Sequence, residues 1–114
     1  MPRCKNFAMK PNDLMAGLPG EFLVRQGLAD AQAGRLTAEA CLISIARSRL
    51  SRAGLVPETM SDLPREPELC LYRLLRAQGG DAYSRYNALL RELVSFEMAL
   101  DRRLRKDSTL HGCA

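Results

Sequence analysis

Residues 82–105 read AYSRYNALLRELVSFEMALDRRLR, the longest stretch of the chain in which apolar residues recur every three to four positions. This spacing places side chains on one side of an α-helix, whose repeat is about 3.6 residues. The main apolar row consists of Tyr86, Leu89, Leu93, Phe96, Leu100 and Leu104. A second row, which widens the apolar arc to about 200°, consists of Tyr83, Leu90, Val94 and Met98. One antiparallel neighbour does not cover so broad an arc, so we expect this helix to be central in the domain or to contact another subunit.

A helix is predicted upstream over 21–33, between Pro19 and the helix-ending Gly34. Gly27 falls on its apolar side, which predicts close approach by a neighbouring helix, because glycine otherwise weakens a helix. Asp30 falls on the polar side and is expected to face water.

Two more helices are predicted from their end signals. Thr37 suits the N-cap of a helix over 38–53, and Gly54 suits its end. Pro67 suits the first turn of a helix over 67–78, and the pair Gly79–Gly80 ends it. A break this short favours an antiparallel hairpin with the helix over 82–105.

These elements predict an all-α domain of four helices, arranged as two helical hairpins joined by the loop 55–66. Strict apolar–polar alternation is nowhere sustained, so no strand is expected. Residues 1–18 lack periodicity and are predicted to form an irregular arm, with Phe7, Met9 or Leu14 anchoring it on the domain. The helical domain then covers 19–105, and 106–114 is predicted to be a flexible tail.

Composition and charge are those of an ordinary globular domain. The 114 residues are 46% hydrophobic and 26% charged, with a net charge of +4. The basic residues are mostly arginine, which we attribute to a GC-rich bacterial genome. Neither an export signal nor a membrane-length apolar stretch is visible. We therefore expect a cytoplasmic protein with no membrane contact, whose four cysteines (Cys4, Cys41, Cys70 and Cys113) are reduced.

No motif of catalysis or cofactor binding stands out. Zinc requires about four converging ligands, and Cys4, His111 and Cys113 lack the usual spacing. The only histidine is close to the end of the chain, so a Cys or Ser nucleophile has no obvious base. The Gly79–Gly80 pair follows no strand and precedes no Lys-Ser/Thr, which indicates a turn and not a phosphate loop. We expect no metal, no cofactor and no enzymatic activity.

Three charged residues fall on predicted apolar faces: Arg49 in the helix over 38–53, and Glu97 with the nearby Asp101 in the helix over 82–105. A buried charge is costly unless it is paired. The hypothesis is that Arg49 meets Glu97 or Asp101 across a helix interface, within one subunit or between two. Such a pair would fix helix packing; a functional version would be a polar pocket for an anionic or amphipathic ligand.

The preferred function is a non-enzymatic protein–protein interaction or regulatory module, a homodimer that associates through the second apolar row. A nucleic-acid-binding role is the first alternative, and the residues expected to contact phosphates are Arg47, Arg52, Arg102, Arg103 and Arg105. It is disfavoured because positive charge is interleaved with negative charge along the chain. Ligand binding around Arg49 and Glu97 is the other alternative.

Overall fold

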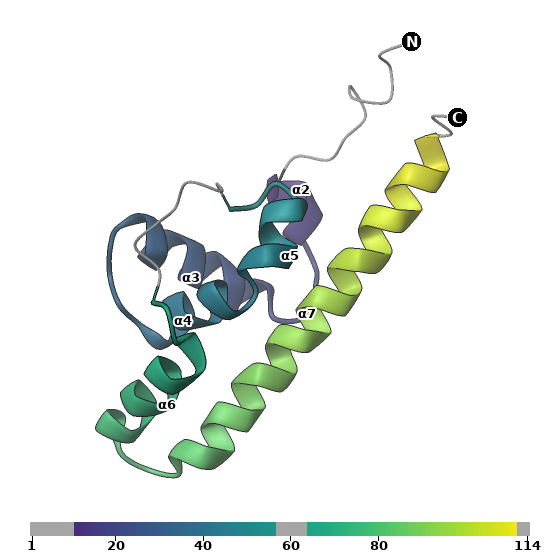
Figure 1. Ribbon diagram of the computed structural model, residues 1–114. Coiled ribbons are helices and arrows are strands. Elements are labelled where there is room, and N and C mark those ends of the chain that lie inside the picture. Colours follow the sequence, from purple (N-terminus) through teal and green to yellow (C-terminus); the bar gives the residue numbers. More distant parts are fainter. Residues whose placement is uncertain (1–10, 57–63, 112–114) are drawn as a thin grey trace.

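A computed structural model describes residues 11–56 and 64–111, and within these ranges the chain forms helices and no strand. The helices are α2 (Pro11–Met15), α3 (Glu21–Gln32), α4 (Ala38–Ile45), α5 (Arg47–Arg52), α6 (Pro67–Gln78) and α7 (Ala82–His111). Helix α7 runs along one side of the molecule, and the shorter helices lie together on its flank (Figure 1). The all-α prediction is confirmed.

The predicted end signals act as expected at three places. The Thr37 hydroxyl accepts a hydrogen bond from the Ala40 amide at 3.2 Å and so caps α4. Helix α6 begins at Pro67, which has no amide hydrogen to leave unsatisfied in a first turn. Between α6 and α7, Gly79 and Gly80 have φ values of 83° and 78°, a region that other residues seldom adopt.

The number of helices differs from the four expected. The predicted helix over 38–53 is divided at Ala46, whose ψ of 10° separates α4 from α5. Helix α2 forms inside the arm that was expected to be irregular, and α7 continues to His111, beyond the expected end at 105. Leu50 of α5 is fully buried in the core on the far side of this break.

The N-terminal arm is part of the packed structure from residue 13 onward. Leu14, Met15 and Leu18 are buried in the core, whereas the proposed anchors Phe7 and Met9 lie outside the described residues. Arg103 of α7 donates hydrogen bonds to backbone carbonyl oxygens of the arm, those of Asp13, Leu14 and Ala16. Carbonyls at the end of a helix lack partners inside it, so this guanidinium satisfies the end of α2 and ties it to α7.

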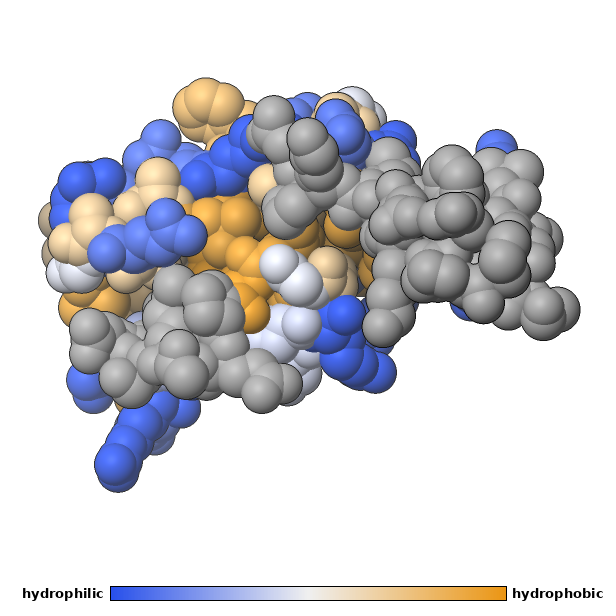
Figure 2. Space-filling view, turned by 90° about the horizontal axis from the view of Figure 1, so that it is seen from above, coloured by the Kyte–Doolittle hydropathy of each residue, from blue (hydrophilic) through white to orange (hydrophobic). Residues whose placement is uncertain are grey.

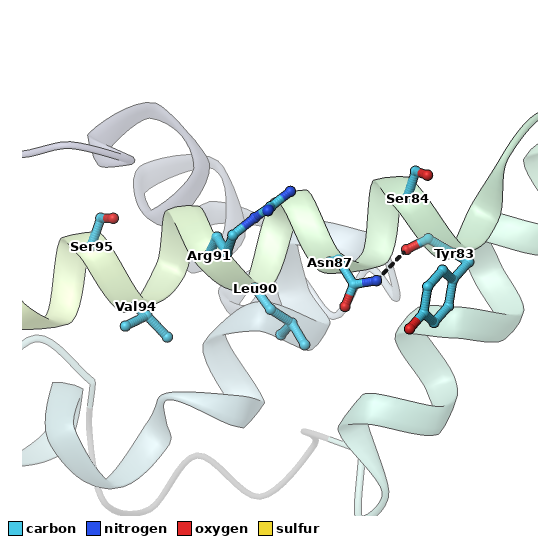
Figure 3. Close-up of a pocket in the computed structure, with 7 residues that line it drawn as sticks. All are labelled: Tyr83, Ser84, Asn87, Leu90, Arg91, Val94 and Ser95. Carbon is cyan, nitrogen blue, oxygen red and sulfur yellow. Dashed lines mark hydrogen bonds between the residues drawn. The ribbon is translucent and has the colours of Figure 1, made fainter.

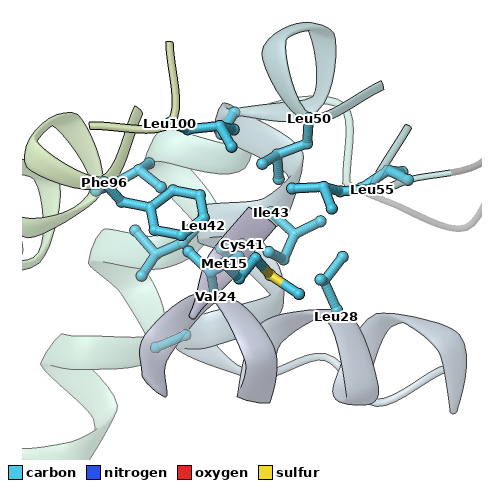
Figure 4. Packing of buried hydrophobic residues seen from close by; sticks show 14 of the residues in the cluster. Met15, Val24, Leu28, Cys41, Leu42, Ile43, Leu50, Leu55, Phe96 and Leu100 are labelled. Carbon is cyan, nitrogen blue, oxygen red and sulfur yellow. The ribbon is translucent and has the colours of Figure 1, made fainter. Parts of the chain in front are cut away.

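The core is a single apolar cluster to which every described helix contributes. Phe96 and Leu100 enter it from α7, and Leu42 enters from α4 (Figure 4). Seen from above, apolar side chains gather at the centre of the face, with hydrophilic side chains above and to the left of them (Figure 2). Across the two described ranges, no helix combines the length and the apolar character needed to cross a membrane.

Helices α3 and α4 approach each other closely at Gly27. A β-carbon at this position would collide with the backbone carbonyl oxygen of Glu39 and would lie 2.6 Å from Cγ1 of Ile43. The close approach inferred from the sequence is therefore present, and it involves backbone atoms that cannot rotate away.

The expectation that Asp30 faces water was wrong, because this residue is only 3% exposed. The chain between α3 and α4 folds back over its carboxylate. Oδ2 accepts a hydrogen bond from the Thr37 hydroxyl at 2.7 Å, and Oδ1 accepts from Arg35 Nε and Gln26 Nε2, both at 3.0 Å. The bonds from Thr37 and then Arg35 hold the pKa of Asp30 below its usual value, so this stabilisation is present near neutral pH and is lost as pH falls.

Candidate functional site

The second apolar row of α7 lies on the surface. Tyr83 is 67% exposed, Met98 is 54% exposed and Val94 is 49% exposed, while Leu90 is half-buried between them. We call these four residues the α7 face. A large exposed apolar side chain is common by itself, but three on one side of a helix form a candidate contact surface.

The α7 face is open and almost neutral. Three of its residues, Tyr83, Leu90 and Val94, line a shallow hollow of about 630 Å³ together with Ser84, Asn87, Arg91 and Ser95. All the lining residues belong to α7, so the hollow is an open strip along one helix and not an enclosed cavity. Tyr83, Asn87, Leu90 and Val94 point to the same side, with Arg91 and Ser95 along the other edge (Figure 3).

The packing of α7 explains why this row remains uncovered. Helices α2, α3, α4 and α6 pack on the side of α7 that carries the main row. Leu93, Phe96 and Leu100 of that row are at most 2% exposed. Leu90 of the second row still packs against the core, whereas Tyr83, Val94 and Met98 are exposed, which agrees with the excess apolar arc in the sequence.

The three charged residues expected at a helix interface are brought together. Arg49 of α5 donates a hydrogen bond to Oδ2 of Asp101 at 2.8 Å and lies 3.6 Å from Oε2 of Glu97, measured from Nη1 and Nε respectively. Both carboxylates are on α7, so the cluster joins α5 to α7 within one chain.

The expected burial of Arg49 was wrong, because its side chain is 47% exposed. The helical wheel assumed one helix over 38–53, whereas α5 is separated from α4 at Ala46 and Arg49 lies at the edge of its contact with α7. The side chain of Asp101 is 44% exposed, and of the three only that of Glu97, at 15% exposed, is largely buried. An ion pair with this exposure contributes little to stability, roughly 0–1 kcal/mol.

A small hollow of about 320 Å³ adjoins the cluster and is lined by Arg49, Arg52, Asp101 and Leu104. Two arginines and one carboxylate line it, and Glu97 lies near Arg49 without lining the hollow. The hollow is polar enough for a small anion, but the charge of Arg49 is already engaged by Glu97 and Asp101. Ligand binding here therefore stays a prediction from sequence.

Burial raises the pKa of Glu97, and the charge of Asp101 adds to this effect while Arg49 opposes it. The folded state thus holds the Glu97 proton to a higher pH than the unfolded chain does. Ionisation of this group then costs stability as pH rises from the ordinary value of 4.5 through the folded pKa.

Replacing Glu97 with glutamine is expected to remove that loss of stability. The free energy of unfolding, measured by urea denaturation between about pH 4.5 and pH 7, should fall less with rising pH for Glu97→Gln than for the native chain. Glu92→Gln is the matched control, since Glu92 is exposed on the same helix. If the free energy of unfolding changed with pH in the same way for the native chain and Glu97→Gln, the raised pKa of Glu97 would be contradicted.

The arginines considered for nucleic-acid contact do not gather on one surface. Arg52 lines the hollow beside Arg49, whereas Arg102 and Arg103 line another hollow with Leu18 and Pro19. Arg103 is occupied by backbone carbonyls of the arm, Arg47 is half-buried, and Arg105 is exposed. Among the described residues these five arginines are thus divided over more than one place, and nucleic-acid binding stays a prediction from sequence.

Metal ligands do not converge in the described part of the chain, where no group of three or more His, Cys, Asp or Glu side chains has a suitable arrangement. The zinc site considered from sequence used Cys4 and Cys113, which lie outside the described residues. Comparison with models of protein families, with curated proteins and with solved structures finds no match to this chain.

Proposed function

We propose that this chain is a non-enzymatic interaction module that binds through the α7 face, and that the partner is a second copy of the chain. The observation that carries the proposal is the exposure of Tyr83, Val94 and Met98 on one side of a long, well-packed helix. Burying such side chains against a partner is favourable by about 25 cal/mol per Å² of apolar surface removed from water.

The charge of the surface favours a like partner. The chain carries a net charge of +4, yet only Arg91 among the residues around the hollow is charged. Two copies that bring these faces together therefore each contribute one charged side chain, Arg91, to the hollow. An acidic partner would find little on this face to attract it.

The order of residues along α7 is also compatible with an antiparallel pair. A two-fold axis between Leu90 and Arg91 places Tyr83 opposite Met98 and Asn87 opposite Val94. The face spans about four turns of helix, or roughly 22 Å. Contacts of this size bury less than about 1,200 Å² in total, so we expect a weak dimer with a Kd in the micromolar range.

Sedimentation equilibrium over a concentration series tests this proposal. The native chain should shift from monomer to dimer as concentration rises, and Val94→Glu should weaken the association by at least about tenfold, because a charge would be desolvated in the contact. Ala88→Glu is the matched control, since Ala88 is exposed on another side of α7. A native chain that stays monomeric at every concentration, or equal effects of the two variants, would contradict the proposal.

A further inference from the structure

Two cysteine thiols meet where α4 packs against α6, away from the α7 face. Cys41 of α4 is fully buried, and Cys70 of α6 is partly exposed. The two side chains are close enough to share a thiol hydrogen bond, and both are free. We propose that Cys41 and Cys70 are a site of reversible oxidation, at which hydrogen peroxide converts the thiol pair into a disulfide that joins α4 to α6.

The positions of the two residues suit a crosslink. They come from different helices, and α4 and α6 have one of the most extensive helix contacts in the molecule. A disulfide requires α-carbons about 4.4–6.8 Å apart. Thiols that interact across two packed helices are placed for side-chain rotation to bring them toward this geometry.

The difference in exposure assigns the order of reaction. Peroxide reaches the partly exposed Cys70 first, because Cys41 has no accessible surface. The Cys70 thiolate attacks one peroxide oxygen, so that an S–O bond forms and the O–O bond breaks. Hydroxide leaves and takes up a proton, giving water and a sulfenic acid on Cys70.

Cys41 then completes the crosslink. Its sulfur attacks Sγ of Cys70, the S–S bond forms and the S–O bond breaks. The departing hydroxyl takes the Cys41 proton and leaves as a second water. Two thiols and one peroxide thus give one disulfide and two waters. A small thiol reductant reverses the reaction by exchange.

The state of Cys41 accords with this order. Burial, followed by the hydrogen bond with Cys70, raises the pKa of Cys41 to about 12, so it is a thiol and not a thiolate at neutral pH. Such a group is a poor first nucleophile. It is able to act in the second step because the leaving hydroxide is a strong enough base to take its proton.

The disulfide would close a long loop, from α4 through α5 to α6, and so restrict the unfolded chain. For a loop of about 30 residues, loop-closure entropy predicts that Tm rises by about 10 °C.

The experiment uses the full chain with Cys4 and Cys113 replaced by serine, so that Cys41 and Cys70 are the only thiols. The protein is treated with hydrogen peroxide and examined by thiol titration, intact mass and thermal unfolding. Cys41→Ala and Cys70→Ala in the same background are the matched variants, and circular dichroism before treatment checks that each is folded.

The expected result is loss of both thiols, a mass lower by two hydrogens and a Tm higher by about 10 °C, all reversed by dithiothreitol. Cys41→Ala should stop at a sulfenic acid that dimedone traps, without a rise in Tm. Cys70→Ala should leave Cys41 unmodified. Persistence of both thiols, oxidation of Cys70 without a crosslink, or a disulfide only between two chains would overturn the proposal. None of these results depends on dimer formation through the α7 face.

Discussion

Replacing Phe96 with alanine is expected to lower the free energy of unfolding by about 4 kcal/mol. Phe96 has no exposed surface and is the largest fully buried side chain in the described core. It extends from α7 toward the side chains of α4 (Figure 4), so its removal leaves a cavity where the long helix meets the rest of the domain. Urea denaturation monitored by circular dichroism measures the change.

Phe22→Ala is the matched control, because it makes the same chemical change at a position that is 78% exposed. We expect that variant to remain within about 0.5 kcal/mol of the native chain. A domain of this size has only about 5–15 kcal/mol in total, so Phe96→Leu provides a milder second point if Phe96→Ala does not fold. Similar losses for Phe22→Ala and Phe96→Ala would show that α7 is not packed as described.

The elements predicted best are those whose ends carry distinctive residues. Helix α6 begins at Pro67 and ends at Gln78, as expected, because proline and the following glycine pair restrict the backbone whatever surrounds them. The end of α7 had no such signal. No glycine or proline occurs between 105 and 111, and the helix accordingly continues to His111.

The features that were missed depend on contacts between elements. Nothing local predicts a break at Ala46, since alanine has the highest helix propensity, and the exposure of Arg49 in the short helix that follows was missed as well. Asp30 is buried because the turn leading to Thr37 folds over it, an arrangement that a helical wheel does not represent. The only signal in the sequence for this burial was the presence of polar residues, Asp30 and Thr37, on either side of the short connection between α3 and α4.

The candidate site, the α7 face, could be predicted from the sequence. The arc of apolar residues on α7 was too broad for one neighbour, and a wheel measures this property directly. The Cys41–Cys70 contact was not predicted, because spacing within each helix carries no information on which residues of two helices meet. The close approach at Gly27 was inferred, but its partner in α4 was not.

Replacing Gly27 with alanine is expected to lower the free energy of unfolding by about 2 kcal/mol, although helix propensity alone predicts a gain of about 1 kcal/mol. The added methyl group would collide with the Glu39 carbonyl oxygen and lie 2.6 Å from Cγ1 of Ile43. The carbonyl belongs to the backbone of α4, so relief requires that α3 and α4 separate along their contact. That separation loosens apolar packing between two helices that both contribute to the core.

The sign of the effect distinguishes packing from propensity. Ala29→Gly is the control, since Ala29 is exposed on the same helix and should lose only about 1 kcal/mol through propensity. If α3 and α4 were further apart than described, Gly27→Ala would stabilise the protein, and Ala29→Gly would change stability by a similar amount in the opposite direction. A loss at both positions, larger at Gly27, is expected because only there does a β-carbon meet the backbone of a neighbouring helix.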